Sequence, residues 1–204
     1  MKKRGALALL LWAAMALLLT GCLFRPPDEL YRRPERSAGY DQLAAAIRSV
    51  KTGLEGQFGV SCEDAVIVAG DNTASIQLQD LDGDGQRESA VAFIRVPGVE
   101  KSLKIYIFTA TEDSYQKTEL IEGSGTGIYS IAYTDLDGDG RMELLVGWKA
   151  TTELQVLEVY ALRPGGAALL VRSDYVKYTA MDLDQDQRQE LVVLHADEGG
   201  DGVA

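Results

Sequence analysis

Short apolar runs with a period of two fill the chain from about residue 75 onward, and clusters of Gly, Asp and Ser separate them. Alternation of this kind predicts β-strands with one buried face. Ten strands are expected, at residues 75–79, 90–94, 103–109, 117–121, 130–134, 144–148, 154–162, 167–172, 178–181 and 191–194. They predict two units of four antiparallel strands, at about 75–122 and 128–175, followed by a half unit at 176–204.

Four antiparallel strands in about 50 residues match the size of a β-propeller blade. The fold class predicted for residues 63–204 is therefore mainly β, with about two and a half four-stranded propeller blades. Known propellers have about four to eight blades, so we expect an incomplete ring whose other blades lie outside this chain. The alternatives are blades completed in an oligomer and a small open β-domain.

One amphipathic helix is expected at residues 40–56, ahead of the strands. Its apolar positions recur every three or four residues, at Tyr40, Leu43, Ala44, Ile47, Val50 and Leu54. Gly39 precedes this pattern, and Gly53 and Gly56 mark its predicted end. A single helix of this kind must cover an edge or a face of the strands that follow.

The first 21 residues are predicted to be a targeting segment rather than part of the fold. A basic stretch at residues 2–4 is followed by 15 uncharged residues at 5–19, which is short for a transmembrane helix. The sequence Leu-Thr-Gly-Cys then ends at Cys22 and resembles the lipobox of bacterial lipoproteins. The resemblance implies cleavage after Gly21 and diacylation of Cys22. The alternative is a plain secretory signal with an incidental cysteine.

Two acyl chains on one cysteine would give stable membrane anchoring. Residues 22–39 combine proline with arginine and acidic side chains, which is typical of an extended, solvated tether. We therefore expect a lipid-anchored protein on the extracytoplasmic face of a bacterial membrane, with the membrane as its partner through Cys22.

Charge narrows the range of other partners. Beyond residue 21 the chain has 17 basic and 31 acidic residues, which is a net charge of −14. Such a chain repels phosphate groups, so we expect no nucleic-acid partner and favour cations. With Cys22 acylated, Cys62 is expected to be a small buried side chain or a free thiol, and His195 a surface residue. A nucleophilic pair of Cys62 and His195 is the enzymatic alternative.

Three acidic segments repeat between the predicted strands, and each begins with Asp-Leu-Asp. They cover residues 80–88, 135–143 and 182–190, and their first aspartates are 55 and 47 residues apart. Three carboxylates at alternate positions of a tight turn point to one centre, and their repulsion is costly unless a cation lies between them. Hard oxygen ligands suit calcium, so the pattern predicts two to three structural Ca²⁺ sites.

The predicted calcium ligands are the carboxylates and one backbone carbonyl of each loop. The side chains are Asp80, Asp82, Asp84 and Glu88, then Asp135, Asp137, Asp139 and Glu143, then Asp182, Asp184, Asp186 and Glu190. The carbonyls are those of Gln86, Arg141 and Arg188. Glycine pairs permit a positive φ in the first two bends, at Gly83, Gly85, Gly138 and Gly140. In the third loop Gln185 and Gln187 replace both glycines, so that bend is expected to lose its easy positive-φ positions.

These loops differ from an EF-hand, which needs a carboxylate at position 12 and lies between two helices. Position 12 is valine in all three loops, and the glutamate at position 9 closes the turn instead. Over residues 75–196 the pattern resembles the FG-GAP/VCBS calcium loops of integrin-α-type propellers and bacterial extracellular repeat proteins. The resemblance implies propeller blades whose turns hold calcium.

The calcium loops use all the clustered carboxylates, so no catalytic pair of carboxylates is left outside them. We therefore expect a binding or interaction module without enzymatic activity, whose ligand is a protein or a glycan. One alternative is a fragment of a propeller hydrolase or lyase whose catalytic residues lie outside this chain. Another is a structural lipoprotein of the cell envelope.

Overall fold

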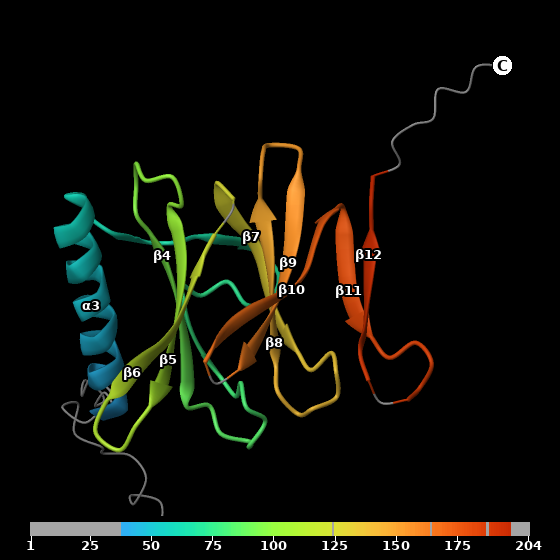
Figure 1. Cartoon of the computed structure of the whole chain (residues 1–204), viewed down its shortest axis with the longest axis horizontal. Coiled ribbons are helices and arrows are strands. Elements are labelled where there is room, and N and C mark those ends of the chain that lie inside the picture. The colour runs from blue at the N-terminus through green and yellow to red at the C-terminus, as the bar shows by residue number, and fades with distance from the viewer. Residues whose placement is uncertain (1–37, 124, 164, 187, 197–204) are drawn as a thin grey trace, which may run out of the picture. The chain divides into compact units, whose positions relative to one another are not determined.

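The computed structural model describes residues 38–123, 125–163, 165–186 and 188–196. These residues form one helix and twelve strands, so the predicted mainly β fold is confirmed (Figure 1). The predicted lipobox, Cys22 and most of the tether fall at residues 1–37, outside the described residues. Among the residues that are described, no helix is long and apolar enough to cross a membrane.

The first sheet contains five strands that follow the helix. They are β1 (Glu63–Asp64), β3 (Ile76–Gln79), β4 (Ser89–Arg95), β5 (Leu103–Ala110) and β6 (Tyr115–Glu122). Both β1 and β3 pair antiparallel with β4, at different parts of that strand, and β5 and β6 follow outward. The four strands β3 to β6 correspond to the first predicted unit.

The second sheet repeats this order. It contains β2 (Ile67–Ala69), β7 (Gly127–Thr134), β8 (Glu143–Lys149), β9 (Gln155–Arg163) and β10 (Gly166–Tyr175). A separate antiparallel pair, β11 (Lys177–Met181) with β12 (Glu190–Leu194), forms the third sheet. The second predicted unit and the final hairpin are therefore both present.

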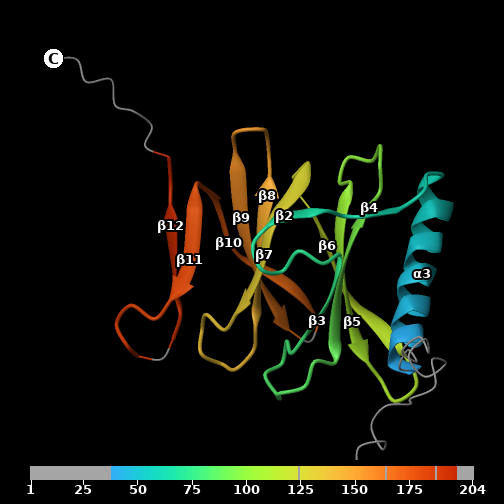
Figure 2. The same ribbon diagram turned by 180° about the vertical axis from the view of Figure 1, so that it is seen from behind.

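Two short strands were not predicted, and they give the first two sheets five strands instead of four. β1 has two residues and β2 has three, which is too short for a period of two to show in the sequence. β2 pairs in parallel with β7, although it precedes the whole first unit in the chain (Figure 2). The segment from β1 to β2 therefore connects the two sheets by backbone pairing.

Helix α3 (Ala38–Phe58) is longer than predicted at both ends. The glycines expected to limit it, Gly39, Gly53 and Gly56, all lie inside it. Glycine costs a helix only about 1 kcal/mol relative to alanine, so packing can outweigh it. The helix ends at Phe58, and the next residue, Gly59, has φ of +70° and donates its N–H to the carbonyl of Glu55.

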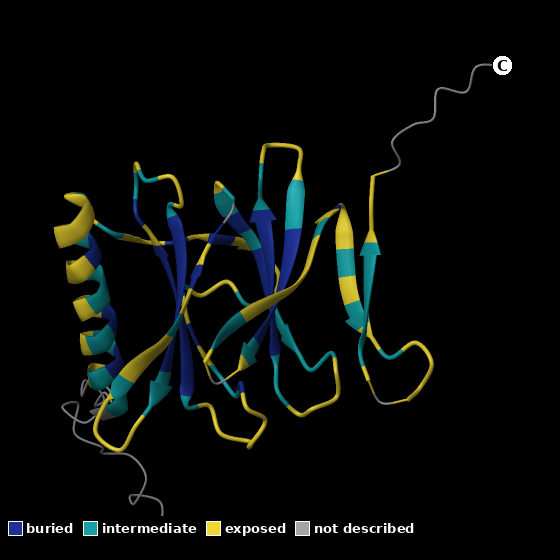
Figure 3. Cartoon of the chain, viewed as in Figure 1, coloured by how far each residue is buried: buried dark blue, intermediate teal, exposed yellow. Residues whose placement is uncertain are grey.

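Helix α3 covers one face of the first sheet. Leu43, Ile47 and Leu54 are buried there against strands β4 and β5 (Figure 3). Cys62 is partly buried beside the same core and is a free cysteine, as expected. Its Sγ lies 3.7 Å from the backbone carbonyl of Lys51, and burial raises the pKa of its thiol.

The first and second sheets pack through corresponding faces. Val91 and Phe93 follow the first loop at the same distances as Val146 and Trp148 follow the second, and all four lie in one core. Propeller blades are repeated radially, which brings the front of one blade against the back of the next. In the first two sheets corresponding faces meet instead, as in the two layers of a sandwich, so the packing order of propeller blades is absent between them.

The third sheet packs in the order that a propeller requires. Leu191 and Val193 correspond to Leu144 and Val146, and they lie against the opposite face of the second sheet, where Leu145 is buried. Because α3 covers the remaining face of the first sheet, no further blade can pack there without displacing the helix. Among the described residues, the sheets form an open stack rather than a closed ring.

Candidate metal centres

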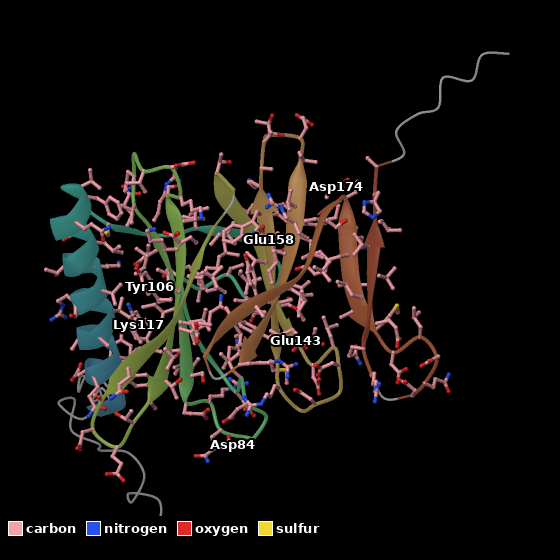
Figure 4. All side chains as sticks on the ribbon, in the orientation of Figure 1. Asp84, Tyr106, Lys117, Glu143, Glu158 and Asp174 are labelled. Atoms are coloured by element: carbon pink, nitrogen blue, oxygen red, sulfur yellow. The ribbon has the colours of Figure 1, made fainter. Side chains whose placement is uncertain are left out.

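The three acidic loops join the strands of three hairpins, β3–β4, β7–β8 and β11–β12. They lie along the lower side of the sheets in Figure 1, and Asp84 and Glu143 are labelled in Figure 4. Each loop connects two paired strands, so strand pairing fixes where the loop begins and ends. The fold therefore places all the predicted ligands in turns at strand ends.

The first aspartate of each glycine-containing loop shapes the turn with both of its oxygens. Asp80 accepts the N–H of Gly83 at Oδ1 and that of Gly85 at Oδ2, each at 2.8 Å. Asp135 does the same for the second loop, at 2.7 and 2.9 Å. Aspartate side chains commonly accept hydrogen bonds from nearby backbone N–H groups in turns. The repeat therefore has the same backbone course in both loops.

Carboxylate oxygens converge in each loop to within 4.8 Å of one another. The converging groups are Asp80, Asp82 and Asp84, then Asp135, Asp137 and Glu143, then Asp182, Asp184 and Glu190. The predicted ligands Glu88, Asp139 and Asp186 belong to the same loops but lie outside these groups. Three carboxylates therefore meet in every loop, although not the same three positions.

The glutamate at position 9 behaves differently in the first loop. Glu143 accepts the N–H of Leu136 at 2.8 Å, and Glu190 accepts that of Leu183 at 2.7 Å. Glu88 makes no such bond, and its Oε2 atom is buried without a hydrogen-bond partner. A buried oxygen without a partner is costly, and a cation in the loop would supply one.

Burial raises the pKa of both Glu88 and Glu143, and the aspartates of their own loops raise it further. A carboxyl with a raised pKa destabilises the fold once it is ionised, at pH values above that pKa. In the metal-free loops, burial and the neighbouring aspartates therefore both disfavour the ionised forms of Glu88 and Glu143, and a bound cation would favour them.

The predicted carbonyl ligands belong to Gln86, Arg141 and Arg188. The backbone N–H of each donates to Oδ1 of the third aspartate of its loop, at 2.7, 2.8 and 2.9 Å. These bonds hold the backbone of Gln86, Arg141 and Arg188 beside the third aspartate of each loop. Coordination through the carbonyls themselves stays a prediction.

The third loop keeps the bend without glycine. Gly83 and Gly138 have φ of +78° and +74°, and Gln185 at the corresponding position has φ of +66°. Gln185 therefore keeps the positive φ of the bend without the ease that glycine gives it, and Gln187 lies outside the described residues. A non-glycine residue pays about 1 kcal/mol or more for this conformation, so the loop carries strain that its other bonds must offset.

The three loops touch one another. The N–H of Met142 donates to the carbonyl of Leu81 at 3.0 Å, which joins the second loop to the first. Gly83 lies directly against the backbone of Gly140. The side chain of Arg188, from the third loop, lies over Gly138 of the second. The candidate sites therefore form one connected row.

Gly83→Ala is expected to lower the free energy of unfolding by about 1–3 kcal/mol more than Gly85→Ala. Both glycines have positive φ, so both substitutions share the conformational cost. Only at Gly83 would the new Cβ collide with backbone, at the carbonyl group of Gly140. Nothing lies within 4 Å of a Cβ placed on Gly85. Urea unfolding of the two variants measures the difference, and equal losses would refute the contact between the loops.

The sequence did not reveal Arg163, at the end of β9. Its guanidinium contacts Asp137 and Asp139 of the second loop, 26 and 24 residues earlier in the chain. No local pattern could show this, because the contact depends on how β9 pairs with β8. Arg163 also borders a cavity of about 540 Å³ between the first two sheets, together with Glu88, Arg141 and Thr109.

The structure does not bring Cys62 and His195 together as a nucleophilic pair. Cys62 lies by the helix-covered face of the first sheet. His195 follows β12 in the third sheet, is exposed as expected, and has its Nδ1 3.5 Å from a carboxylate oxygen of Asp174. The two side chains therefore belong to opposite ends of the stack.

The donors in the loops are oxygens alone, without the thiols or imidazoles that zinc and copper prefer. The unpartnered oxygen of Glu88 is a further sign that the first loop suits a cation. The fold and the loops together define a protein of repeated antiparallel sheets with carboxylate-lined turns. The residues present fit calcium, and the protein would hold it with the converging carboxylates described above.

A family model for the FG-GAP-like repeat matches residues 80–146. The match runs from the first aspartate of the first loop into β8, so it includes two of the three loops. The FG-GAP part of the resemblance seen in the sequence is confirmed over this range. No curated protein and no solved structure matches the chain.

Proposed function

We propose that this protein is a membrane-anchored, extracytoplasmic interaction module in which calcium stabilises FG-GAP-like repeats. The observation that carries the proposal is the connected row of three turns, each with three converging carboxylates. FG-GAP-like repeats often bind calcium, and the family match covers two of these turns.

Calcium in these turns would have a structural role. In each loop the proposed ligands come from one short turn between two paired strands, so an ion would tie the strand ends together. Extracellular calcium modules bind with dissociation constants of about 10⁻⁴ to 10⁻³ M, which suits a site outside the cell. Such binding adds to the free energy of unfolding by mass action.

Interaction rather than catalysis is the proposed activity. The carboxylates that gather among the described residues do so in the loops, where they are proposed calcium ligands. Loops supported by rigid sheets are a common place for protein or glycan recognition. The ligand is therefore proposed to be an extracytoplasmic protein or glycan.

The anchor is proposed from the lipobox-like sequence that ends at Cys22. Cys22→Ser is expected to move the protein from the membrane fraction to the soluble fraction and to abolish labelling by radioactive palmitate. Cys62→Ser, at the other cysteine of the chain, is the matched control and should change neither result. Membrane association that survives Cys22→Ser would contradict the lipid anchor.

A further inference from the structure

Arg163 forms two ion pairs with the second acidic loop. Its Nη2 atom lies 2.8 Å from Oδ2 of Asp137, and its Nη1 atom lies 3.5 Å from Oδ2 of Asp139. Both aspartates are predicted calcium ligands. The guanidinium therefore contacts oxygens of two predicted calcium ligands, of which Asp137 belongs to the converging group of this loop and Asp139 does not.

The remaining oxygens of these two aspartates are also engaged. Oδ1 of Asp137 accepts the N–H of Asp139 at 3.1 Å, and Oδ1 of Asp139 accepts the N–H of Arg141 at 2.8 Å. Three of the four oxygens of the pair therefore accept a hydrogen bond before any metal ion binds, and the fourth lies in an ion pair with Arg163.

The first loop lacks this arrangement. Within the described part of the chain, its carboxylates form no ion pair with a basic side chain. The second oxygen of Asp84 accepts from the neutral amide of Gln86 at 3.1 Å. Tyr160 pairs with Leu144, and Thr109 pairs with Ser89, which holds the same position after the first loop. Arg163 comes three residues after Tyr160, so its counterpart in the first unit is Glu112, which is acidic.

A second basic side chain lies near the second loop. The Cγ and Nε atoms of Arg188 would be 3.2 Å from a Cβ placed on Gly138. The second loop is thus bordered by arginine on two sides, from β9 and from the third loop. Asp82 and Glu88 of the first loop share a cavity with Arg141 and Arg163, so the two loops differ in ion pairing rather than in the presence of arginine nearby.

We infer that Arg163 acts as a built-in counter-cation of the second loop, which competes with calcium there and holds the loop in shape when no ion is bound. This inference rests on the proposed calcium binding. It follows that the first loop binds calcium more tightly than the second. It also follows that the second loop depends less on calcium for its order.

The size of the effect follows from the exposure of the pair. The side chain of Arg163 is 51% exposed, so solvent screens its attraction to the carboxylates. Calcium must displace the guanidinium or bind beside it. We therefore expect removal of the charge to tighten binding at the second loop by about tenfold rather than by several orders of magnitude.

Calorimetric titration of the full chain with calcium tests this inference. Arg163→Gln should tighten one site by about tenfold. The same substitution in the background Asp137→Asn with Asp139→Asn should change nothing, because its contacts are already absent. Arg95→Gln is the charge-matched control, since Arg95 is exposed at the far end of β4 and should leave every affinity unchanged.

Hydrogen exchange gives a second readout that does not depend on affinity. In chelator, the amides of Gly83 and Gly85 should exchange faster than in calcium, whereas those of Gly138 and Gly140 should stay protected. In Arg163→Gln, all four amides should lose protection in chelator. This pattern separates a counter-cation from a side chain that only packs against the loop.

Each contrary outcome has a distinct meaning. Unchanged or weaker calcium binding in Arg163→Gln would overturn the inference while leaving calcium binding itself intact. An equal change in the background without the two aspartates would overturn it as well. Failure of the unsubstituted chain to bind calcium at any loop would instead refute the proposed function.

Discussion

Trp148→Ala is expected to lower the free energy of unfolding by about 3–5 kcal/mol, the range for truncating a large buried aromatic side chain. Trp148 has 0% exposure and lies in the core between the first two sheets. In a chain of this length, about 4 kcal/mol corresponds to a fall in melting temperature of roughly 10 °C.

The loss of stability expected for Trp148→Ala also has a polar component. The indole Nε1 of Trp148 donates to Oε2 of Glu158 at 2.5 Å, and the hydroxyl of Tyr160 donates to the same oxygen at 2.6 Å. Glu158, labelled in Figure 4, is only 3% exposed. Removing one donor from a buried carboxylate costs about 1–3 kcal/mol.

Thermal unfolding in calcium-containing buffer measures both components. Trp148→Phe keeps an aromatic ring but removes the donor, so its loss should lie between zero and that of Trp148→Ala. Leu154→Ala is the control for an exposed apolar side chain and should change stability by less than about 0.5 kcal/mol. A similar small loss for Trp148→Ala would contradict the packing of the first two sheets.

The second large effect is calcium-dependent. Asp82→Asn combined with Asp84→Asn is expected to lower the melting temperature by about 5–10 °C in calcium, because one site adds about 2.7 kcal/mol to stability when free calcium is about 100 times its dissociation constant. In chelator the variant and the unsubstituted chain should melt together, or the variant slightly higher. The removal of two like charges relieves repulsion in the metal-free loop.

Substitution of Asp82 and Asp84 tests calcium binding while the backbone hydrogen bonds that shape the turn are kept. Asparagine keeps a carbonyl oxygen for the N–H bonds that Asp82 and Asp84 accept at Oδ1. Substitution of Asp80 would be less informative, because both of its oxygens accept N–H groups that shape the loop. Equal melting shifts in calcium and in chelator would refute calcium as the stabilising ligand.

The strands and the acidic turns were predictable because both depend on local sequence. Alternation fixed the positions of β4, β5, β8 and β9 to within about one residue, and the Asp-Leu-Asp repeats marked the three turns. The helix was also predictable, but its ends were not. Gly39, Gly53 and Gly56 indicate helix ends in isolation, whereas packing of Leu43 and Leu54 on the sheet extends the helix past them.

The arrangement of the sheets could not be read from the sequence. Val91 and Val146 hold the same position after their loops, and both lie in the core between the first two sheets. No local sequence pattern shows that the two sheets turn these faces toward each other. The ion pairs of Arg163 and the strand β2 were missed for the same reason, since both depend on segments distant in the chain. The unpartnered oxygen of Glu88 likewise becomes visible only in three dimensions.

The most direct test of the account is the number of calcium ions that the full chain retains. Equilibrium dialysis against about 1 mM calcium, followed by elemental analysis, gives this number at a concentration suited to extracellular sites. We expect at least one bound ion per chain, assigned to the first loop, with further ions as the calcium concentration rises. A chain that retains no calcium above the dialysis buffer at 10-fold higher concentration would contradict the account.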